Sequence, residues 1–319
     1  MKSFFSIDWG TSSLRIRLVN SEKNTPEILY EHSDQNGTGH VFRLWDNEKR
    51  NTSQRDFFLQ FLQGRLAEFY KYLPTGTPLP PVVISGMASS SIGILELPYS
   101  KIPFDLNGDD LTYEVIRKTT DFDHEILLLS GLCCSDDVMR GEETQLLGLH
   151  AWHNLFPEAL YIFPGTHSKH IYVKKNQVTS FKTYITGELF KLLSEYSVLK
   201  NSIQTPEPFN TESFISGLEL SGDNLLNSTF KIRARSVLSK KDCTGNQSLL
   251  SGLLIGYEIN SLKNMDLPIY LCAHENLSHN YTLAIKHLSL EDRCTMVPAK
   301  AVDESVVHGQ YLMIKKIAL

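Results

Sequence analysis

The chain has 319 residues, 41% of them hydrophobic and 21% charged, so it can bury a core large enough for about two domains. Its net charge of −5 and the lack of a strongly basic stretch argue against nucleic-acid binding, which depends on attraction to phosphates. The five cysteines are odd in number and have no regular spacing, which argues against a disulfide scaffold, and the lack of a Cys-x-x-Cys pair argues against a zinc site. The sequence has no run of about 18 apolar residues, so no membrane span is predicted.

The first half of the chain begins with a predicted β-hairpin. Residues 4–8 form an apolar strand that ends at Gly10, and residues 14–19 alternate apolar and polar side chains, the period of a half-buried strand. An amphipathic helix is predicted at 53–73, where phenylalanines and leucines recur at spacings of three and four. Short buried strands follow at 82–84 and 126–129.

The second half alternates strands and helices. A strand at 159–163 is stopped by Pro164 and Gly165, and another begins at 170 and ends at 173. Helices are predicted at 142–152, 188–199, 248–262 and 277–288, and a further strand at 268–272. This alternation indicates an α/β protein.

Two turns in matching contexts carry the main functional signal. One reads Gly10-Thr11-Ser12-Ser13 and the other Gly165-Thr166-His167-Ser168, each between two strands. Glycine permits a left-handed φ and leaves no Cβ in the way of a ligand, while N–H groups and hydroxyls in such a turn can bind an anion. The repeat predicts a duplicated domain whose turns hold phosphate, although each could also be an ordinary hairpin turn. Asp8, just before the first turn, is expected to hold Mg²⁺ through its water shell.

Neither phosphate-binding motif of the common nucleotide-binding folds occurs. A Gly-x-x-x-x-Gly-Lys-Ser/Thr sequence is absent, as is a Gly-x-Gly-x-x-Gly sequence after a strand. The sequence therefore disfavours both a P-loop enzyme and a dinucleotide-binding fold.

The local motifs resemble those of the 2-dehydro-3-deoxygalactonokinase family, in the sugar kinase, Hsp70 and actin superfamily. The matching segments, in family order, are DWGTS (8–12), MRGEETQ (139–145), PGTHSK (164–169), TGELF (186–190) and SGLLIG (251–256). The resemblance implies an α/β, two-domain actin-like ATPase (ribonuclease H-like) fold with an interdomain cleft, divided into residues 1–135 and 136–319. It also implies ATP and Mg²⁺ as cofactors, with ATP gripped by one turn from each side.

The loop at 86–93 departs from the family. Ser91 and Ile92 stand where the family carries Arg and Gln, and an Arg would be the natural bidentate partner of a substrate carboxylate. The loop therefore leaves open which sugar acid is the acceptor. The candidate substrate contacts in this loop are Gly86, Ser89 and Ser90, with loop hydrogen bonding as the alternative for the two serines.

The candidate catalytic residues lie around one helix start. Glu142 and Glu143 follow Arg140 and Gly141, and either glutamate could accept the proton of a sugar hydroxyl, with Glu142 preferred, or could simply stabilise the helix start. Arg140 could bind a carboxylate or a phosphoryl group, or form a surface ion pair. Arg15 could reach the substrate, or could share a solvated charged face with Arg17.

The nucleotide side is expected around the second turn. Lys169 could pair with phosphate or be an exposed hairpin lysine, and His167 could contact the ligand or only cap the turn. Gly252 and Gly256 indicate close backbone approach near adenosine, or else helix packing. Ala273 and His274 stand where related kinases carry a Gly-rich adenosine contact, so adenine binding could be altered. The cofactor residues expected on this basis are Gly10, Thr11, Ser12, Gly165, Thr166, His167, Ser168, Lys169, Gly252 and Gly256.

These features lead to one main hypothesis with two alternatives. The main hypothesis is an ATP-dependent cytoplasmic kinase of a 2-keto-3-deoxy sugar acid, most simply 2-dehydro-3-deoxy-D-galactonate. The alternatives are a kinase of another sugar or sugar acid, and a non-catalytic nucleotide- or sugar-binding protein on the same fold. The expected partners are small molecules, without nucleic acid or membrane, and the family resemblance adds a homodimer.

Overall fold

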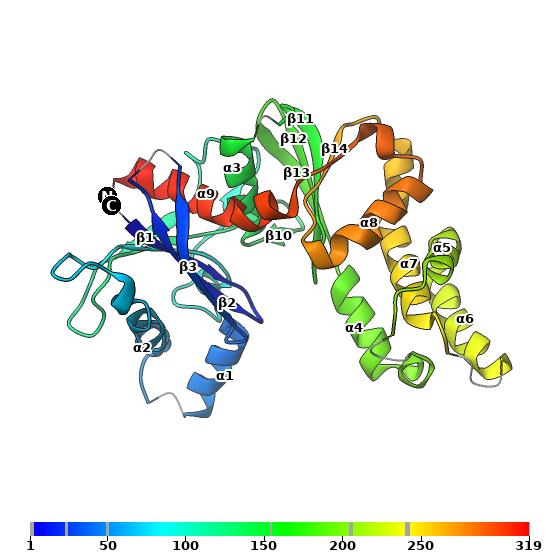
Figure 1. Ribbon diagram of the computed structural model, residues 1–319, viewed down its shortest axis with the longest axis horizontal. Coiled ribbons are helices and arrows are strands. Elements are labelled where there is room, and N and C mark those ends of the chain that lie inside the picture. The colour runs from blue at the N-terminus through cyan, green and yellow to red at the C-terminus, as the bar shows by residue number, and fades with distance from the viewer. Residues whose placement is uncertain are drawn as a thin grey trace. The chain divides into compact units, whose positions relative to one another are not determined.

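The chain folds into two compact units. The computed structural model describes residues 3–22, 25–48, 51–153, 155–203, 207–239 and 243–318. The first unit comprises Met1–Leu155, Lys175–Ser180 and Lys300–Leu319, and the second comprises Phe156–Lys174 and Phe181–Ala299. Each unit is built around a β-sheet with helices beside it (Figure 1).

The first unit contains a mixed sheet with the strand order β3-β2-β1-β4-β8-β7. The strands of this unit are β1 (Ser3–Trp9), β2 (Leu14–Asn20), β3 (Glu27–Asp34), β4 (Val82–Gly86), β5 (Ser100–Lys101), β6 (Phe104–Asp105), β7 (Tyr113–Ile116), β8 (Ile126–Leu129), β9 (Leu132–Cys133) and β10 (Val138–Met139). Strands β5, β9 and β10 form a separate small sheet in the order β10-β9-β5. Its helices are α1 (Thr38–Asn47), α2 (Gln54–Ala67), α3 (Glu142–Trp152) and, from its second residue on, α9 (Ala299–Ile317). Strands β1, β2 and β3 pair antiparallel, whereas β1, β4 and β8 run parallel.

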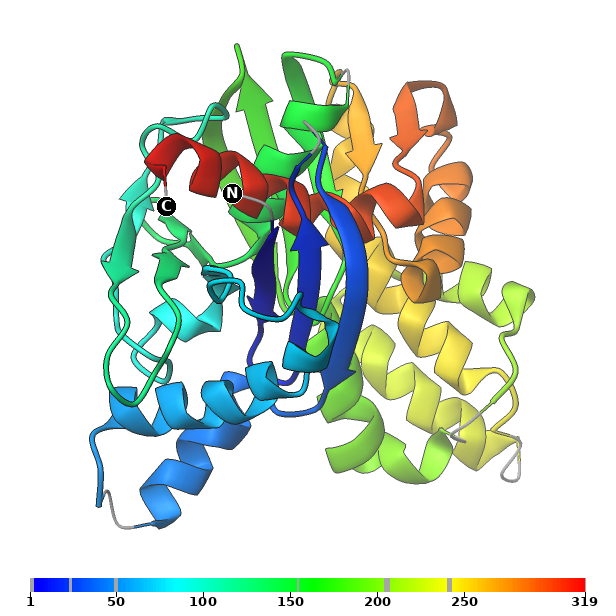
Figure 2. The ribbon, with the colours of Figure 1, turned by 60° about the vertical axis from the view of Figure 1, so that its left-hand side comes forward.

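The two faces of this sheet pack against different helices. Because side chains alternate along a strand, Ile7 and Trp9 of β1 face the core that they share with Phe58 and Leu62 of α2. The opposite face meets α9, where Gln310 donates hydrogen bonds to the Ile7 carbonyl at 2.8 Å and to Ser85 Oγ at 2.9 Å. Figure 2 shows α9, in red, crossing beside the blue strands β1 and β2.

Helices α3 and α9 approach each other closely through glycines. A Cβ on Gly148 of α3 would lie 1.9 Å from the Ser305 carbonyl oxygen, and one on Gly309 of α9 would lie 2.0 Å from the Thr144 carbonyl oxygen. Only glycine fits at these two positions, so the backbones themselves form the contact. As a result α3 is held in the first unit.

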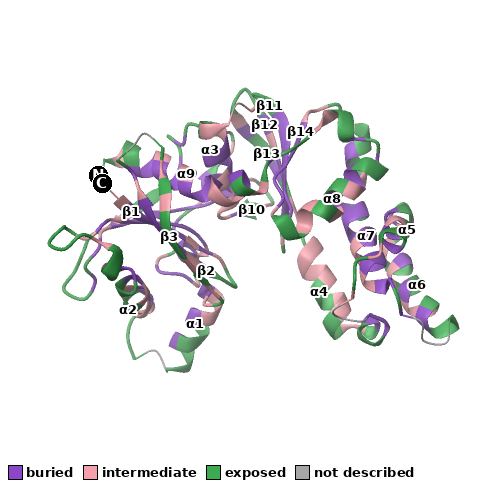
Figure 3. Cartoon of the chain, viewed as in Figure 1, coloured by how far each residue is buried: buried purple, intermediate pink, exposed green. Residues whose placement is uncertain are grey.

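The second unit has the strand order β15-β14-β11-β12-β13. Its strands are β11 (Glu158–Phe163), β12 (Ser168–Lys174), β13 (Gln177–Tyr184), β14 (Ile269–Leu271) and β15 (Cys294–Met296), and its helices are α4 (Thr186–Tyr196), α5 (Thr211–Leu220), α6 (Leu225–Leu238), α7 (Asn246–Ile259) and α8 (Glu275–His287). The first residues of β13, up to Ser180, belong to the first unit, where Gln177 and Val178 pair with β6. Helix α7 is almost wholly buried, whereas α4 has no fully buried residue (Figure 3).

The two sheets repeat one plan. The order β13-β12-β11-β14-β15 matches β3-β2-β1-β4-β8, with an antiparallel hairpin followed by parallel strands in each case. This is the ribonuclease H-like arrangement, and two copies of it in one chain make the actin-like ATPase fold. The predicted α/β class and the predicted duplication are both confirmed.

The units divide the chain differently from the boundary expected at residues 135 and 136. Helix α3 lies after that boundary but packs in the first unit, and so does α9 from Lys300 on. The physical reason is the close α3–α9 contact together with the hydrogen bonds from Gln310 to β1 and β4. Elements that the sequence did not reveal include β3, α1, β13, α5, α6 and α9.

The helix expected at 53–73 is shorter than predicted. Helix α2 ends at Ala67, and a 3-10 turn at Tyr70–Tyr72 follows it. At its start the hydroxyl of Ser53 accepts a hydrogen bond from the Asp56 N–H and so caps the helix. None of the helices within the described ranges is both long enough and apolar enough to cross a bilayer.

Candidate active site

The first turn connects β1 and β2. Asp8 and Arg15 are directly opposed across the hairpin, so their side chains lie on the same sheet face. The Gly10 N–H donates to the Ser13 carbonyl at 3.0 Å, and Thr11, Ser12 and Ser13 are exposed. The carbonyls of Gly10 and Thr11 accept hydrogen bonds from the N–H groups of residues 38 and 39 at the start of α1.

The glycines of the two turns provide space for a ligand but do not adopt the left-handed backbone conformation that glycine permits. Neither Gly10 nor Gly165 has a left-handed φ, so that part of the prediction is wrong. A Cβ on Gly165 would meet no atom within 4 Å, and one on Gly10 would meet only ordinary contacts. Both turns therefore leave open space where a side chain would otherwise stand.

Left-handed glycines occur instead where β1, β4 and α3 meet. Gly86 has φ 91°, and its Cβ would lie 2.8 Å from the Trp9 carbonyl oxygen and 3.5 Å from Asp8 Oδ1. Gly141 has φ 111°, and its Cβ would lie 3.8 Å from the Cα of Gly86. The Asp8 carboxylate thus lies at the carboxyl ends of two parallel strands, the position where open α/β sheets bind ligands.

Arg140 holds the loop at 86–93 in place. Its guanidinium donates to Ser89 Oγ at 2.6 Å and to the Leu97 carbonyl at 3.1 Å, and it lies 4.0 Å from the centroid of the Tyr99 ring. A planar guanidinium is suited to such combined stacking and hydrogen bonding. The arrangement makes Arg140 a support for the loop rather than a surface ion pair.

The two candidate serines of this loop use their hydroxyls internally. Ser89 donates to the Gly86 carbonyl at 3.3 Å, and Ser90 donates to the Met87 carbonyl at 2.7 Å. Gln54, the first residue of α2, donates to the carbonyls of Ser91 and Gly93. The loop is therefore shaped by short-range hydrogen bonds, and the side chain of Ser91 is exposed.

The two glutamates at the start of α3 differ in environment. Glu143 is only 1% exposed, and its carboxylate accepts hydrogen bonds from the Gly141 N–H at 2.8 and 3.0 Å and from Thr144 Oγ1 at 2.9 Å. Burial, with a contribution from the charge of Glu142, raises the pKa of Glu143 to about 7. Glu142 is only half-buried. Glu142 is therefore the more accessible of the two acids.

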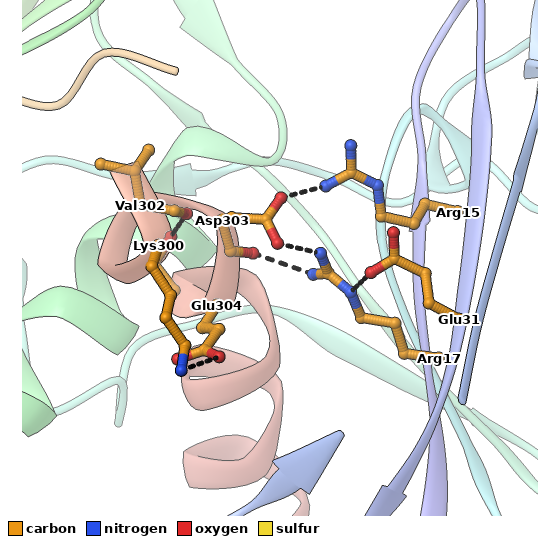
Figure 4. A network of polar contacts seen from close by, with 8 residues as sticks. Arg15, Arg17, Glu31, Lys300, Val302, Asp303 and Glu304 are labelled. Carbon is orange, nitrogen blue, oxygen red and sulfur yellow. Dashed lines mark hydrogen bonds and ion pairs between the residues drawn. The ribbon is translucent and has the colours of Figure 1, made fainter. Parts of the chain in front are cut away.

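Arg15 and Arg17 form an ion-pair network with α9. Arg15 lies 2.6 Å from Asp303 Oδ1, and Arg17 lies 2.5 Å from both Asp303 Oδ2 and Glu31 Oε2 (Figure 4). Arg17 is 2% exposed, so the alternative of a solvated charged face is wrong. Packing of α9 on the sheet buries Arg17, and the paired carboxylates make that burial possible.

The second turn is braced by the start of α4. A Cβ on Gly187 would lie 2.6 Å from the Gly165 carbonyl oxygen, and the Glu188 N–H donates to the Thr166 carbonyl at 3.0 Å. His167 Nε2 lies 2.5 Å from Glu188 Oε2. Lys169 is 4% exposed and donates to the His167 carbonyl at 3.0 Å, so the alternative of an exposed hairpin lysine is wrong.

A cavity of about 490 Å³ opens beside this turn within the second unit. Gly165 is one of its lining residues, and α4, α7 and α8 supply most of its walls. The lining residues are Gly165, Thr186, Gly187, Phe190, Glu207, Phe209, Gln247, Ser248, Ser251, Leu254, Ile255, Asn276, Leu277, His279, Asn280 and Tyr281. Aromatic and aliphatic walls with a few amide and hydroxyl groups are typical of small-molecule sites.

Gly252 and Gly256 face away from this cavity. A Cβ on Gly252 would lie 2.0 Å from the Phe214 carbonyl oxygen, and one on Gly256 would lie 2.6 Å from Ser221 Oγ. Both glycines therefore allow α5 to pack on α7, the alternative that the sequence left open. Their neighbours Ser251 and Ile255 line the cavity instead.

The Ala273–His274 segment does not line the cavity either. Ala273 is 2% exposed and belongs to the core, and His274 occupies the N-cap position of α8 without a side-chain capping hydrogen bond. The wall on this side comes from the first turns of α8, between Asn276 and Tyr281. The change in adenine binding expected from these two residues therefore has no counterpart in the cavity wall.

The donor set for a metal is sparse. Over the described ranges, no three His, Cys, Asp or Glu side chains gather closely enough to hold a metal ion. Asp8 offers a single carboxylate beside Gly86. That suits Mg²⁺, which keeps most of its waters and needs only one or two carboxylates from the protein.

Comparison with known proteins places the chain among sugar-acid kinases. Residues 8–308 match the family model described as 2-keto-3-deoxy-galactonokinase. The chain is 35% identical to the 2-dehydro-3-deoxygalactonokinase of Escherichia coli (strain K12) over 222 residues, which cover 66% of this chain and 72% of the relative. It is 30% identical to the candidate 2-dehydro-3-deoxygalactonokinase DgoK1 of Rhizobium meliloti (strain 1021) over 268 residues, which cover 80% and 79% of the two chains.

A solved structure shows the same fold. The crystal structure of a candidate 2-dehydro-3-deoxygalactonokinase from Sinorhizobium meliloti superposes with a TM-score of 0.81 at 28% identity. The superposition covers 98% of this chain and 96% of that chain. Both sheets therefore have counterparts in that structure.

Proposed function

Because the chain belongs to the 2-keto-3-deoxy-galactonokinase family, we propose that it transfers the terminal phosphoryl group of ATP to 2-dehydro-3-deoxy-D-galactonate, giving the 6-phosphate and ADP. The observation that carries this proposal beyond family membership is the cavity of about 490 Å³ that Gly165 helps to line. The cavity has room for a nucleoside, and a Cβ on Gly165 would meet no atom within 4 Å, so the second turn leaves space for a ligand beside it.

The second unit would hold the nucleotide. Adenosine fits the chemistry of the cavity, because Phe190 and Leu254 offer apolar surface and Gln247 and Asn280 offer amide groups. The turn from Gly165 to Ser168 would contact the phosphates. Lys169 is buried next to this turn, and its positive charge favours phosphate at that position.

The first unit would hold the acceptor and start the reaction. Glu142 would accept the proton of the attacking hydroxyl, since it is the less buried of the two acids at the start of α3. Arg15 is the proposed partner of the substrate carboxylate, and Ser89 and Ser90 would shape the sugar-binding loop. The first turn, with Thr11 and Ser12 exposed, would contact phosphate oxygens.

Asp8 would hold Mg²⁺ through its water shell. Mg²⁺ would neutralise charge on the phosphate oxygens during transfer. Asp8 lies beside Gly86, and because glycine has no side chain, Gly86 would not obstruct a ligand there. The protein would position this carboxylate through the register of β1 against β4.

The test is a coupled assay for ADP with wild type and Glu142→Gln. We expect wild type to form ADP only when the sugar acid is present, and Glu142→Gln to lower kcat by about 100-fold or more, the usual contribution of a general base. Glu304→Gln, a partly exposed acid on α9 of the same unit, is the control and should keep wild-type kcat. No ADP formation at millimolar sugar acid would refute the acceptor, and wild-type kcat in Glu142→Gln would refute the base.

The acceptor loop supports a second candidate within the same activity. Ser91 is exposed and cannot pair with a carboxylate as an Arg would. A kinase that prefers another sugar or sugar acid would fit this loop. A panel of sugars and sugar acids in the same assay decides between them by the ratio of kcat/KM values.

A further inference from the structure

A buried acid lies inside the most apolar helix of the second unit. Glu258 is 2% exposed and is carried by α7, whose other buried residues are mainly leucine, isoleucine and glycine. An ionised carboxylate at such a position costs a large free energy unless it is fully hydrogen-bonded. Its presence therefore calls for a reason beyond packing.

Four donors from three elements saturate the Glu258 carboxylate. Oε1 accepts from Ser168 Oγ at 2.6 Å and from His170 Nε2 at 3.0 Å, both on β12. Oε2 accepts from Thr186 Oγ1 of α4 at 2.5 Å and from the Tyr281 hydroxyl of α8 at 2.8 Å. Each oxygen thus uses both of its lone pairs.

The donors keep the carboxylate ionised. Burial works against the charge, but the hydrogen bonds and charge of His170, with Ser168 and Thr186, lower the pKa of Glu258 below its ordinary value. A charged acceptor makes stronger hydrogen bonds than a neutral one. Glu258 can therefore fix the positions of its four partners firmly.

Three of those partners belong to the proposed nucleotide site. Ser168 is the last residue of the second turn, and Thr186 and Tyr281 both line the cavity. Next to Thr186, Gly187 packs against the backbone of Gly165, another residue that lines the cavity. Glu258 itself does not line the cavity.

We propose that Glu258 is a positioning residue for ATP, one that fixes the second turn against two walls of the nucleotide cavity. The inference rests on the proposed function, because it concerns the affinity of that same site. Without this carboxylate the turn, α4 and α8 would lose their shared anchor. Binding of ATP would then have to order these elements, and the free energy that this ordering costs would lower the affinity for ATP.

The test is the dissociation constant of ATP for Glu258→Gln, measured by calorimetry without sugar acid. An amide keeps one acceptor oxygen and replaces the other with an N–H₂ donor, so one pair of donors must turn away or reverse. We expect the dissociation constant and the KM for ATP to rise by about tenfold, the effect of losing one or two hydrogen bonds to a charged group. The KM for the sugar acid should stay within about twofold.

A matched control separates positioning from general destabilisation. Arg293→Met removes hydrogen bonds to the Leu262 and Leu267 carbonyls in the same unit, away from the cavity. We expect it to lower the thermal midpoint while leaving the ATP dissociation constant within about twofold of wild type. Equal losses of ATP affinity in Arg293→Met and Glu258→Gln would show a merely structural role and overturn the inference.

A second variant covers the case in which Glu258→Gln does not fold. His170→Phe removes one donor to Glu258 from a residue outside the cavity, and we expect a rise of about two- to fivefold in the ATP dissociation constant. Wild-type affinity in His170→Phe, or in a folded Glu258→Gln, overturns the inference while the proposed function stands. Failure of wild type to bind ATP refutes the proposed function itself.

Discussion

The Asp303 carboxylate should be worth about 2–3 kcal/mol to the packing of α9 on the sheet. Replacing one partner of a buried ion pair costs about 3–5 kcal/mol, because the other charge is left without compensation. Arg17 is 2% exposed, but in Asp303→Ala it would keep Glu31 and the backbone carbonyl at position 303, to which it donates at 2.9 Å. The expected cost is therefore below the full range. Arg15 is about one-third exposed and adds little.

Native-state hydrogen exchange measures this cost where it arises. Amides of α9 and β2 should exchange about 30- to 150-fold faster in Asp303→Ala, since every 1.4 kcal/mol is about tenfold in an opening equilibrium. Lys300→Ala is the control on the same helix, because Lys300 and Glu304 form an exposed pair at 3.7 Å (Figure 4). It should change exchange by about twofold at most. Equal exchange in the two variants would refute the reasoning that burial of Arg17 gives Asp303 its importance.

Two further predictions concern glycine and pH. Gly252→Ala places a Cβ 2.0 Å from the Phe214 carbonyl oxygen and should destabilise the second unit by about 1–3 kcal/mol in a urea titration, whereas Gly165→Ala meets open space and should keep stability but weaken ATP binding. Loss of stability in Gly165→Ala would contradict this. The folded-state pKa of Glu143 is raised from 4.5 to about 7. The contribution of Glu143 to the free energy of unfolding is therefore fully present below pH 4.5 and is lost as pH rises to 7. Relative to Glu143→Gln, wild type should lose about 3 kcal/mol of unfolding free energy across that window, and a flat difference would contradict the burial argument.

The strands beside the two turns could be predicted because their sequences are apolar and the turns that end them contain glycine. Strands β1 and β11 are buried on both faces and read as apolar runs, and the turns between hairpin strands carry glycine. Strand β3 escaped prediction because it has no fully buried residue and therefore no apolar period. The hydrophobic pattern of the sequence therefore predicts buried strands such as β1 and β11 but not an exposed strand such as β3.

Helix α9 shows the opposite difficulty. Its buried face includes Ser305, Gly309 and Gln310, small or polar residues that the approach of α3 and the carbonyls of β1 require. These residues interrupt the apolar face that Val302, Val306 and other buried side chains of α9 form, so the amphipathic pattern is weakened. The position of α9 depends on tertiary contacts, and Arg17 is buried only once α9 is in place.

For the candidate site, the sequence identified the turns but not what supports them. Asp303 and Gln310 lie on the helix that was missed. Glu258 had a readable signal, because a single acid stands in the apolar run of the helix predicted at 248–262. A charge in a buried helix indicates a partner nearby. The identity of its partners, on β12, α4 and α8, depends on the fold.

The duplication extends from the turns to the helices that brace them. In the first unit the start of α1 donates to the carbonyls of Gly10 and Thr11, and a Cβ on Gly37 would lie 2.3 Å from the Thr11 carbonyl oxygen. In the second unit the start of α4 makes the same kind of contact through Gly187. Each bracing helix follows the third strand of its sheet.

This bracing explains how a short Gly-Thr turn can favour an anion. A turn presents carbonyl oxygens as well as N–H groups, and carbonyls facing a phosphate would repel it. The N–H groups of Thr38 and Glu188, at the helix starts, donate hydrogen bonds to one carbonyl of each turn, so these carbonyls point toward the helix and not toward a phosphate. The positive end of a helix dipole then lies beside each turn. The sequence placed the second of these helices two residues late and missed the first. The selectivity of the turns therefore follows from the helices packed on them as much as from the Gly-Thr sequence itself.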